Sequence, residues 1–125
     1  MDESRKRQGT RASSGKAETG ASRSAGAQQE RIDPARLPER MRALDSHWRL
    51  VDGHHLEREF ELPDFRRALE LTRSIGELAE ERDHHPEIVL SYGKVDVRIW
   101  THKAGGLTEK DFDLAAGIDR LPAAA

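Results

Sequence analysis

The stretch Glu80-Glu81-Arg82-Asp83-His84-His85-Pro86 lies between two predicted β-hairpins and decides how the chain passes from one to the other. Pro86 cannot continue a helix and biases the preceding residue away from helical angles, so a helix must end here. A third histidine, in Thr101-His102, arrives after the second hairpin has carried the chain out and back. Three imidazoles that can converge, each with an unperturbed pKa near ~6.5, indicate a site for proton transfer.

A long helix precedes this stretch and begins at Pro63-Asp64. Proline suits the first turn of a helix, and an aspartate beside it can cap the free backbone amides. Residues spaced by three or four predict the apolar stripe of this helix, namely Phe65, Ala68, Leu69, Thr72, Ile75 and Ala79, widened by Leu71 and Leu78. We expect the helix to end near Asp83.

Alternating residue patterns predict a hairpin on each side of the helix. The first joins residues 47–51 to residues 56–62 around Asp52-Gly53, a dipeptide favoured in tight turns. The second turns near Gly93 and has three apolar residues on one face of each strand: Ile88, Leu90 and Tyr92, then Val95, Val97 and Ile99. The opposite face of the return strand then carries Asp96, Arg98, Trp100 and His102.

A short helix is predicted near residues 37–44, and a last helix follows a capping-box pattern from Thr108 to Asp111. The order α-β-β-α-β-β-α predicts an α+β fold, with a four-stranded antiparallel sheet and helices packed on one face. We expect one domain over residues 37–121, a disordered tail over 1–36 and a frayed end over 122–125. Because a domain of this size buries a modest fraction of its surface, we also expect self-association.

Composition limits the classes of function. The 125 residues carry a net charge of -2 and a mean hydropathy of -0.82, which does not favour a nucleic-acid or anionic-membrane partner. The chain has no cysteine, which excludes disulfides and thiolate chemistry. No secretory leader or membrane span is predicted, so we expect a soluble protein of the cytoplasm. The basic cluster Arg5-Lys6-Arg7 could serve as a binding arm, but nearby acidic residues favour a solvated tail.

The histidines at 84, 85 and 102 have three interpretations: polar residues at the ends of elements, metal ligands, or acid/base groups. Adjacent histidines rarely point at one ion and the two-histidine helix motif is missing, so no metal site is predicted. Glu80 lies one helical turn before His84 and could orient its ring or hold positive charge on it, unless it is an ordinary surface carboxylate. Asp111 is expected to cap the last helix, and the second pair, His54-His55, to lie in an exposed loop.

At these positions the chain resembles the pterin-4a-carbinolamine dehydratase family. The resemblance rests on His84-His85-Pro86, Tyr92, Lys94-Val95, Thr101-His102, Gly106-Leu107-Thr108 and Asp111, and upstream on Trp48, Phe60, Asp64-Phe65 and Ala68. It extends from about Leu37 to Leu121. It implies the same sheet and helix arrangement, assembly into dimers or tetramers, and dehydration of a 4a-hydroxytetrahydropterin to a quinonoid dihydropterin without metal or bound cofactor. That reaction would serve tetrahydropterin recycling beside an aromatic amino-acid hydroxylase.

The resemblance also implies roles for individual residues. His84 and His102 would carry proton transfer, and His85 would mainly bind the pterin. Pro86 and the main chain of Thr101, Lys103 and Ala104 would complete the pocket, bordered by Glu80 and Asp111. Trp100 departs from the small residue that some relatives carry there, and would stack on the pterin, narrow the entrance or lie in an interface.

A second hypothesis is a module without enzymatic activity. The same fold also serves as a dimerisation cofactor of transcription factors and, in divergent relatives, as an assembly factor. A module kept only for binding has no use for three imidazoles in register, so the histidine set favours catalysis.

Overall fold

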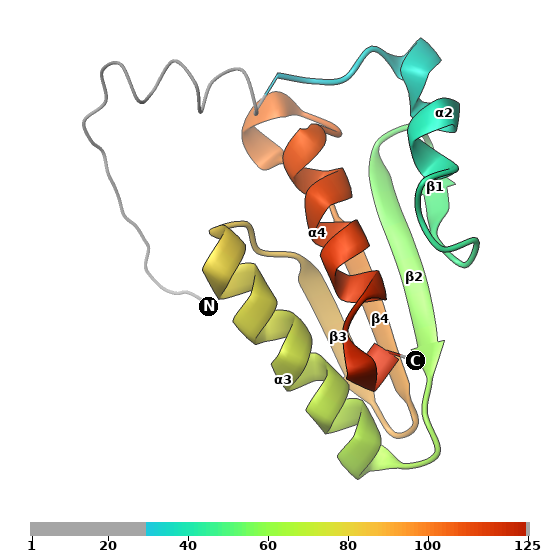
Figure 1. Cartoon of the computed structure of the whole chain (residues 1–125), viewed down its shortest axis with the longest axis vertical. Coiled ribbons are helices and arrows are strands. Elements are labelled where there is room, and N and C mark those ends of the chain that lie inside the picture. The colour runs from blue at the N-terminus through green and yellow to red at the C-terminus, as the bar shows by residue number, and fades with distance from the viewer. Residues whose placement is uncertain (1–29, 125) are drawn as a thin grey trace.

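The computed structural model describes residues 30–124, which form one sheet and the helices that cover one of its faces (Figure 1). The helices and strands are α2 (Leu37–Met41), β1 (Arg49–Val51), β2 (His55–Glu61), α3 (Phe65–Arg82), β3 (Glu87–Ser91), β4 (Lys94–Ile99) and α4 (Glu109–Asp119). Short 3-10 helices occupy Pro34–Arg36, His102–Ala104 and Pro122–Ala124. This order confirms the predicted α+β fold.

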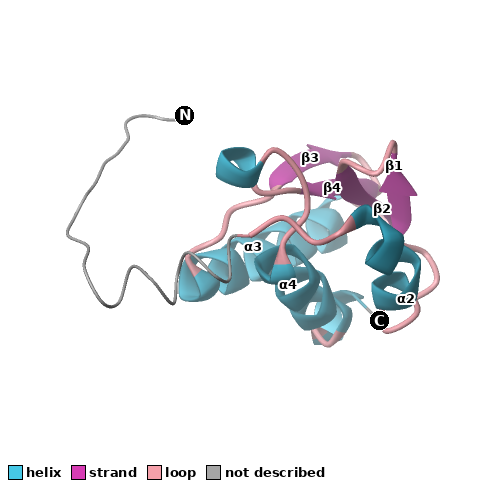
Figure 2. Ribbon diagram, turned by 90° about the horizontal axis from the view of Figure 1, so that it is seen from above, coloured by secondary structure: helices cyan, strands magenta, loops and turns pink. Residues whose placement is uncertain are grey.

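The sheet has the strand order β1-β2-β4-β3, and each neighbouring pair is antiparallel. Figure 2 shows the strands in one layer and α3 and α4 in a second layer on one side of it. The faces that meet are mainly apolar, because the inward-pointing residues of the two central strands are buried and, apart from Arg58, apolar: Leu56, Phe60, Val95, Val97 and Ile99. The predicted alternation along β2 and β4 is therefore confirmed.

Helix α3 begins as expected, with the Asp64 carboxylate accepting a hydrogen bond from the backbone N–H of Arg67 at 2.8 Å. Its buried stripe differs in position from the prediction. Leu71 and Ile75 are fully buried at its centre, whereas Phe65 and Leu69 are 45% and 47% exposed. Apolar residues cover so much of this helix that spacing alone predicted the correct side of the helix but not its centre.

Both ends of the packed chain extend beyond the predicted domain boundaries. Ile32, which we had placed in the tail, is buried and donates its backbone N–H to the Leu107 carbonyl at 2.8 Å. At the other end Pro122–Ala124 forms a 3-10 turn beside α3 instead of a frayed terminus. The predicted disordered, solvated tail, with its alternative of a basic arm, falls on residues 1–29, which lie outside the described residues.

The first hairpin carries an inward-pointing arginine whose partner could not be predicted from strand parity. Arg58 points inward between the apolar residues of β2 and donates to the Asp119 carboxylate at 2.8 Å. The same carboxylate oxygen accepts the indole N–H of Trp48 at 2.7 Å. Trp48 therefore anchors the chain just before β1, which begins at Arg49 rather than at residue 47. The turn itself is as expected, since Asp52 and Gly53 both have positive φ.

Of the helices within residues 30–124, none is long and apolar enough to cross a membrane.

Candidate active site

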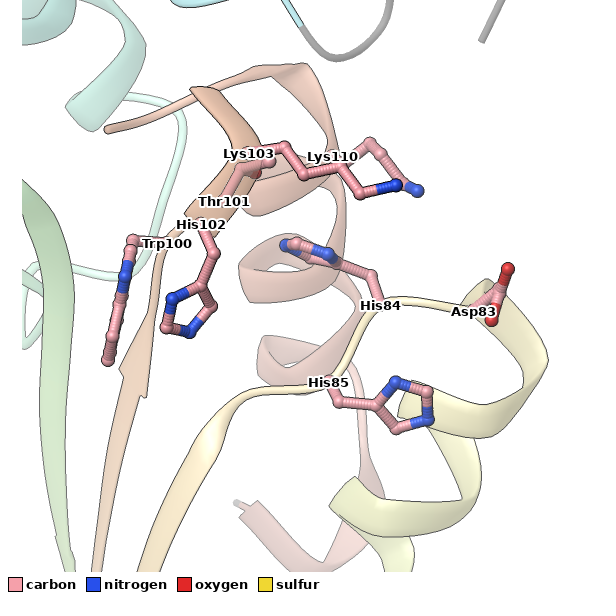
Figure 3. Close-up of a pocket in the computed structure, with 8 residues that line it drawn as sticks. All are labelled: Asp83, His84, His85, Trp100, Thr101, His102, Lys103 and Lys110. Atoms are coloured by element: carbon pink, nitrogen blue, oxygen red, sulfur yellow. The ribbon is translucent and has the colours of Figure 1, made fainter. Parts of the chain in front are cut away.

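The ends of three elements meet at one end of the sheet: the C-terminal end of α3, the C-terminal end of β4 and the N-terminal end of α4 (Figure 1). Between them lies a cavity of about 320 Å³. Figure 3 shows the eight residues that line it, Asp83, His84, His85, Trp100, Thr101, His102, Lys103 and Lys110. The three histidines of the predicted proton-transfer site therefore lie around one cavity.

The end of α3 explains why two adjacent histidines point in different directions. Asp83 has a left-handed backbone with φ of 51°, and the next N–H, that of His84, returns to the Ala79 carbonyl at 3.1 Å. These are the features of a Schellman motif, which usually places glycine at the left-handed position. The reversal turns His84 inward, where it is 8% exposed. His85 then lies outside, with a side chain that is 57% exposed, and Pro86 prevents the helix from resuming.

Asp111 holds His84 from behind the cavity. It is fully buried, and its Oδ1 lies 2.6 Å from Nε2 of His84. Its Oδ2 accepts the Thr101 hydroxyl and the Thr108 backbone N–H, each at 2.8 Å. The second of these bonds completes the predicted capping box of α4, which is confirmed. Because a carboxylate only accepts hydrogen bonds, Nε2 of His84 must carry a proton, and Nδ1 is the ring nitrogen left to exchange one.

His102 reaches the cavity through a tight connection after β4. Thr101 donates its backbone N–H to the Gly106 carbonyl at 3.0 Å, and Gly105 closes the turn with φ of 70°. The ring of His102 lies 4.8 Å from that of Trp100, centroid to centroid, at an angle of 50°. Trp100 thus forms one wall of the cavity beside His102 (Figure 3).

Two predictions about neighbouring groups were wrong. Glu80 contacts His85 rather than His84, with Oε2 at 2.5 Å from Nε2 of His85, and both side chains are exposed. The pair His54-His55 is not an exposed loop: both residues are half-buried, β2 begins at His55, and the two rings lie 5.6 Å and 5.8 Å from the Trp100 ring. Burial lowers the pKa of His55, and the charge of the adjacent His54 lowers it further.

The cavity differs in part from the predicted set of site residues. The lining includes the predicted residues His84, His85, Trp100, Thr101, His102 and Lys103, with Glu80 and Asp111 in contact with two of them. Pro86 and Ala104, both described by the structure, adjoin the lining in sequence but are not part of it. Asp83 and Lys110 line the cavity and were missed. Lys110 follows a recognisable N-cap, which is the one signal that could have placed it near the site.

Comparison with known proteins identifies the family of the chain. Residues 30–121 match the family described as "Pterin 4 alpha carbinolamine dehydratase". The chain belongs to this family. A relative from Rubrobacter xylanophilus, provisionally named a pterin-4-alpha-carbinolamine dehydratase, is 50% identical over 74 residues, which cover 59% of this chain and 69% of the relative. A relative from Alkaliphilus metalliredigens with the same provisional name is 48% identical over 77 residues, covering 62% and 69%.

Two solved structures share the fold. A crystal structure described as a transcriptional coactivator/pterin dehydratase from Brucella melitensis has a TM-score of 0.70 and 35% identity, and covers 77% of this chain and 100% of its own. A pterin dehydratase-like protein described as a RuBisCO assembly factor of the α-carboxysome has a TM-score of 0.52 over 62% of this chain and 92% of its own. At 21% identity, that second likeness concerns the fold alone. The pterin dehydratase fold is therefore shown by sequence and by structure.

The arrangement suits proton transfer inside this family fold. Two imidazoles from different elements line one cavity, and one of them is held by a buried carboxylate. Within residues 30–124 no group of three or more histidine, aspartate or glutamate side chains is placed to hold a metal ion.

Proposed function

We propose that this chain dehydrates a 4a-hydroxytetrahydropterin to the quinonoid dihydropterin and water. The observation that carries the proposal is the position of His84 and His102 on one cavity, with His84 fixed by Asp111. An imidazole can give or take a proton, so two of them suit a reaction in which one proton is given and another is taken. Membership of the dehydratase family supports the same reaction.

The proposed step needs no change of oxidation state. The C4a–O bond breaks and its electron pair leaves with the oxygen, which must receive a proton to depart as water. The ring N5 loses its proton, and its electrons form the C4a–N5 double bond. In our proposal His102 gives the proton to the leaving oxygen, and Nδ1 of His84 takes the proton from N5. Asp111 then stabilises the imidazolium that forms on His84, and each proton transfer contributes about 10²- to 10⁴-fold.

The other lining groups would bind and orient the substrate. The face of Trp100 beside His102 offers a surface on which a flat bicyclic ring can stack. His85 is exposed at the rim, where Glu80 holds its ring. We assign His85, Thr101 and Lys103 to substrate binding. Pro86 would support the segment that carries His85, and Ala104 the segment that carries Thr101 and Lys103.

The wider role follows from the reaction. In our proposal the activity belongs to tetrahydropterin recycling after aromatic amino-acid hydroxylation, in the cytoplasm. The exposed Phe65 and Leu69 on α3 support assembly into a homodimer or homotetramer, because large apolar side chains on a small domain favour self-association.

The direct test is the rate at which the protein dehydrates a chemically generated 4a-hydroxytetrahydropterin, measured against buffer, with and without a chelator. We expect turnover that the chelator does not change. His84→Ala and His102→Ala should each lower it by about 10²- to 10⁴-fold. His85→Ala should chiefly weaken binding, by about two- to tenfold. His47→Gln is the matched control, because His47 is an exposed histidine that contacts Asp45 away from the cavity. Wild-type rates no faster than buffer would defeat the proposal.

The alternative is a binding module with no catalysis. It is favoured by one observation, the 35% identity to a protein whose description combines a transcriptional coactivator with a pterin dehydratase. That alternative predicts that the wild type shows no turnover. It also predicts that the alanine variants of the three histidines still bind the partner.

A further inference from the structure

The side of the cavity away from His85 carries two lysines that the proposed proton transfers do not use. Lys103 comes from the short helix after β4, and Lys110 from the first turn of α4. Both line the cavity, and Figure 3 shows their side chains on one side of His84, with His85 on the other. Two successive elements, joined by a short loop, therefore bring two ammonium groups to the same opening.

Neither lysine is neutralised within the described part of the chain. Lys94 pairs with Glu59 at 3.1 Å, but Lys103 and Lys110 form no ion pair with any carboxylate of residues 30–124. The carboxylates nearest in sequence have other partners, since Glu109 contacts Arg40 and Asp111 is enclosed by His84 and two threonines. Asp83 is the one acidic residue among those that line the cavity. The opening is thus locally positive in a chain whose net charge is -2.

Substrate geometry indicates what this charge would meet. In a pterin the reacting N5 is bonded to C6, which carries the variable substituent of the ring. If C4a and N5 lie at His84 and His102, a substituent on C6 leaves the cavity beside these two histidines. The ammonium groups of Lys103 and Lys110 lie on the cavity beside His84. They would attract a carboxylate or a phosphate on that substituent, whereas a neutral substituent would gain no comparable binding energy from them.

We propose that Lys103 and Lys110 form a subsite for an anionic group on the C6 substituent, so that the preferred substrates are pterins with a carboxylate or phosphate in that chain. The inference rests on the proposed function for the orientation of the ring. It goes beyond that function by naming the class of substituent and by giving a role to Lys110.

The test compares two fluorescent ligands that differ in charge, 6-carboxypterin and 6-hydroxymethylpterin. Their affinities for the full-length protein are measured by fluorescence titration. We expect the anionic ligand to bind about tenfold more tightly, because each exposed ion pair is worth a factor of about two to five. The ratio of the two affinities should fall to about two in the K103Q/K110Q variant and recover in K103R/K110R. It should also fall between low and high salt, because exposed ion pairs are screened.

The control is Lys94→Gln, which removes an equal charge from a lysine that is paired outside the cavity. A ratio near one in the wild type, or a ratio that K103Q/K110Q leaves unchanged, would overturn the subsite. Because binding is measured without turnover, the subsite and the dehydratase reaction fail separately. If neutral and anionic substrates bind equally and are turned over with equal efficiency, the subsite alone is contradicted. If the two ligands bind with the expected ratio but no turnover occurs, the reaction alone is contradicted.

Discussion

Replacing Asp111 with asparagine tests how the site sets the protonation of His84. In the wild type one carboxylate oxygen faces Nε2 of His84 at 2.6 Å, and the other accepts from Thr101 and from the Thr108 backbone N–H at 2.8 Å. An asparagine must keep its oxygen toward Thr108, because an amide NH₂ there would face another donor. Its NH₂ group then faces His84, so Nε2 becomes the acceptor and the proton moves to Nδ1. His84 keeps its place but can no longer take a proton through Nδ1.

The expected loss follows from these contacts. Removing one proton-transfer group costs about 10²- to 10⁴-fold in rate, and a histidine held in the wrong tautomer in a serine protease costs about 10⁴-fold. The variant also loses stability, because the three charge-assisted hydrogen bonds of the carboxylate, of about 1.5–3 kcal/mol each, become neutral bonds of about 1 kcal/mol each. A neutral side chain costs less to bury, which offsets part of this loss. The free energy of unfolding should therefore be lower by about 2–4 kcal/mol, a loss that leaves a domain of ordinary stability folded.

Three measurements follow the change: the dehydration rate above buffer, the midpoint of denaturation, and the ¹⁵N shifts of the His84 ring, which distinguish the tautomers. Asp113→Asn is the control, since Asp113 is an exposed aspartate on the same helix. Because His84 and Asp111 act as one unit, the double variant H84A/D111N should be no slower than H84A. A D111N protein that keeps its rate within about threefold, or losses that multiply in the double variant, would refute the role of Asp111.

Three further predictions concern other parts of the site and sheet. Trp100→Ala should raise KM by about three- to tenfold with a smaller change in kcat, because a stacking face is lost beside His102. Trp100→Phe should restore most of the affinity. Equal kinetics for the wild type and both variants would exclude stacking. Burial raises the pKa of Asp96, so its contribution to stability is complete below the ordinary aspartate pKa of about 3.9 and is lost as pH rises through the folded value. Asp96→Asn should therefore stabilise the protein at neutral pH but not near pH 3.5, and a gain that does not depend on pH would contradict this. Asp83→Gly should raise the free energy of unfolding by up to ~1 kcal/mol, because glycine adopts the left-handed backbone at this position without strain. Asp83→Ala should lower it. Denaturant titration measures both variants, and an alanine variant as stable as the glycine variant would contradict this.

Much of the fold was predictable because its signals are local. Proline at 86, the Asp64 cap, the Asp52-Gly53 turn and the period of two along β4 each limit a few neighbouring residues, and together they give the element order. The convergence of His84 and His102 was predictable in outline. His84 lies just before the first strand of the second hairpin and His102 just after its return strand, and both therefore lie at the open end of that hairpin.

Contacts between distant segments were not predictable from local pattern. The capping box identified Asp111, but its second role toward His84 depends on how α3 packs against α4. Strand parity places Arg58 on the inward face of β2, but its charge partner, Asp119 at the end of α4, depends on how that helix packs on the sheet. The contact of Glu80 with His85 follows from the left-handed turn at Asp83, which reverses the side to which each histidine points.

The central claim is that one cavity holds a pterin between His84 and His102, and a crystal structure with a non-reactive reduced pterin tests it most directly. We predict that the ring stacks on Trp100, with N5 and C4a within hydrogen-bond reach of His84 and His102. A pterin bound on another surface, or a cavity still empty at a saturating concentration of the ligand, would contradict the account.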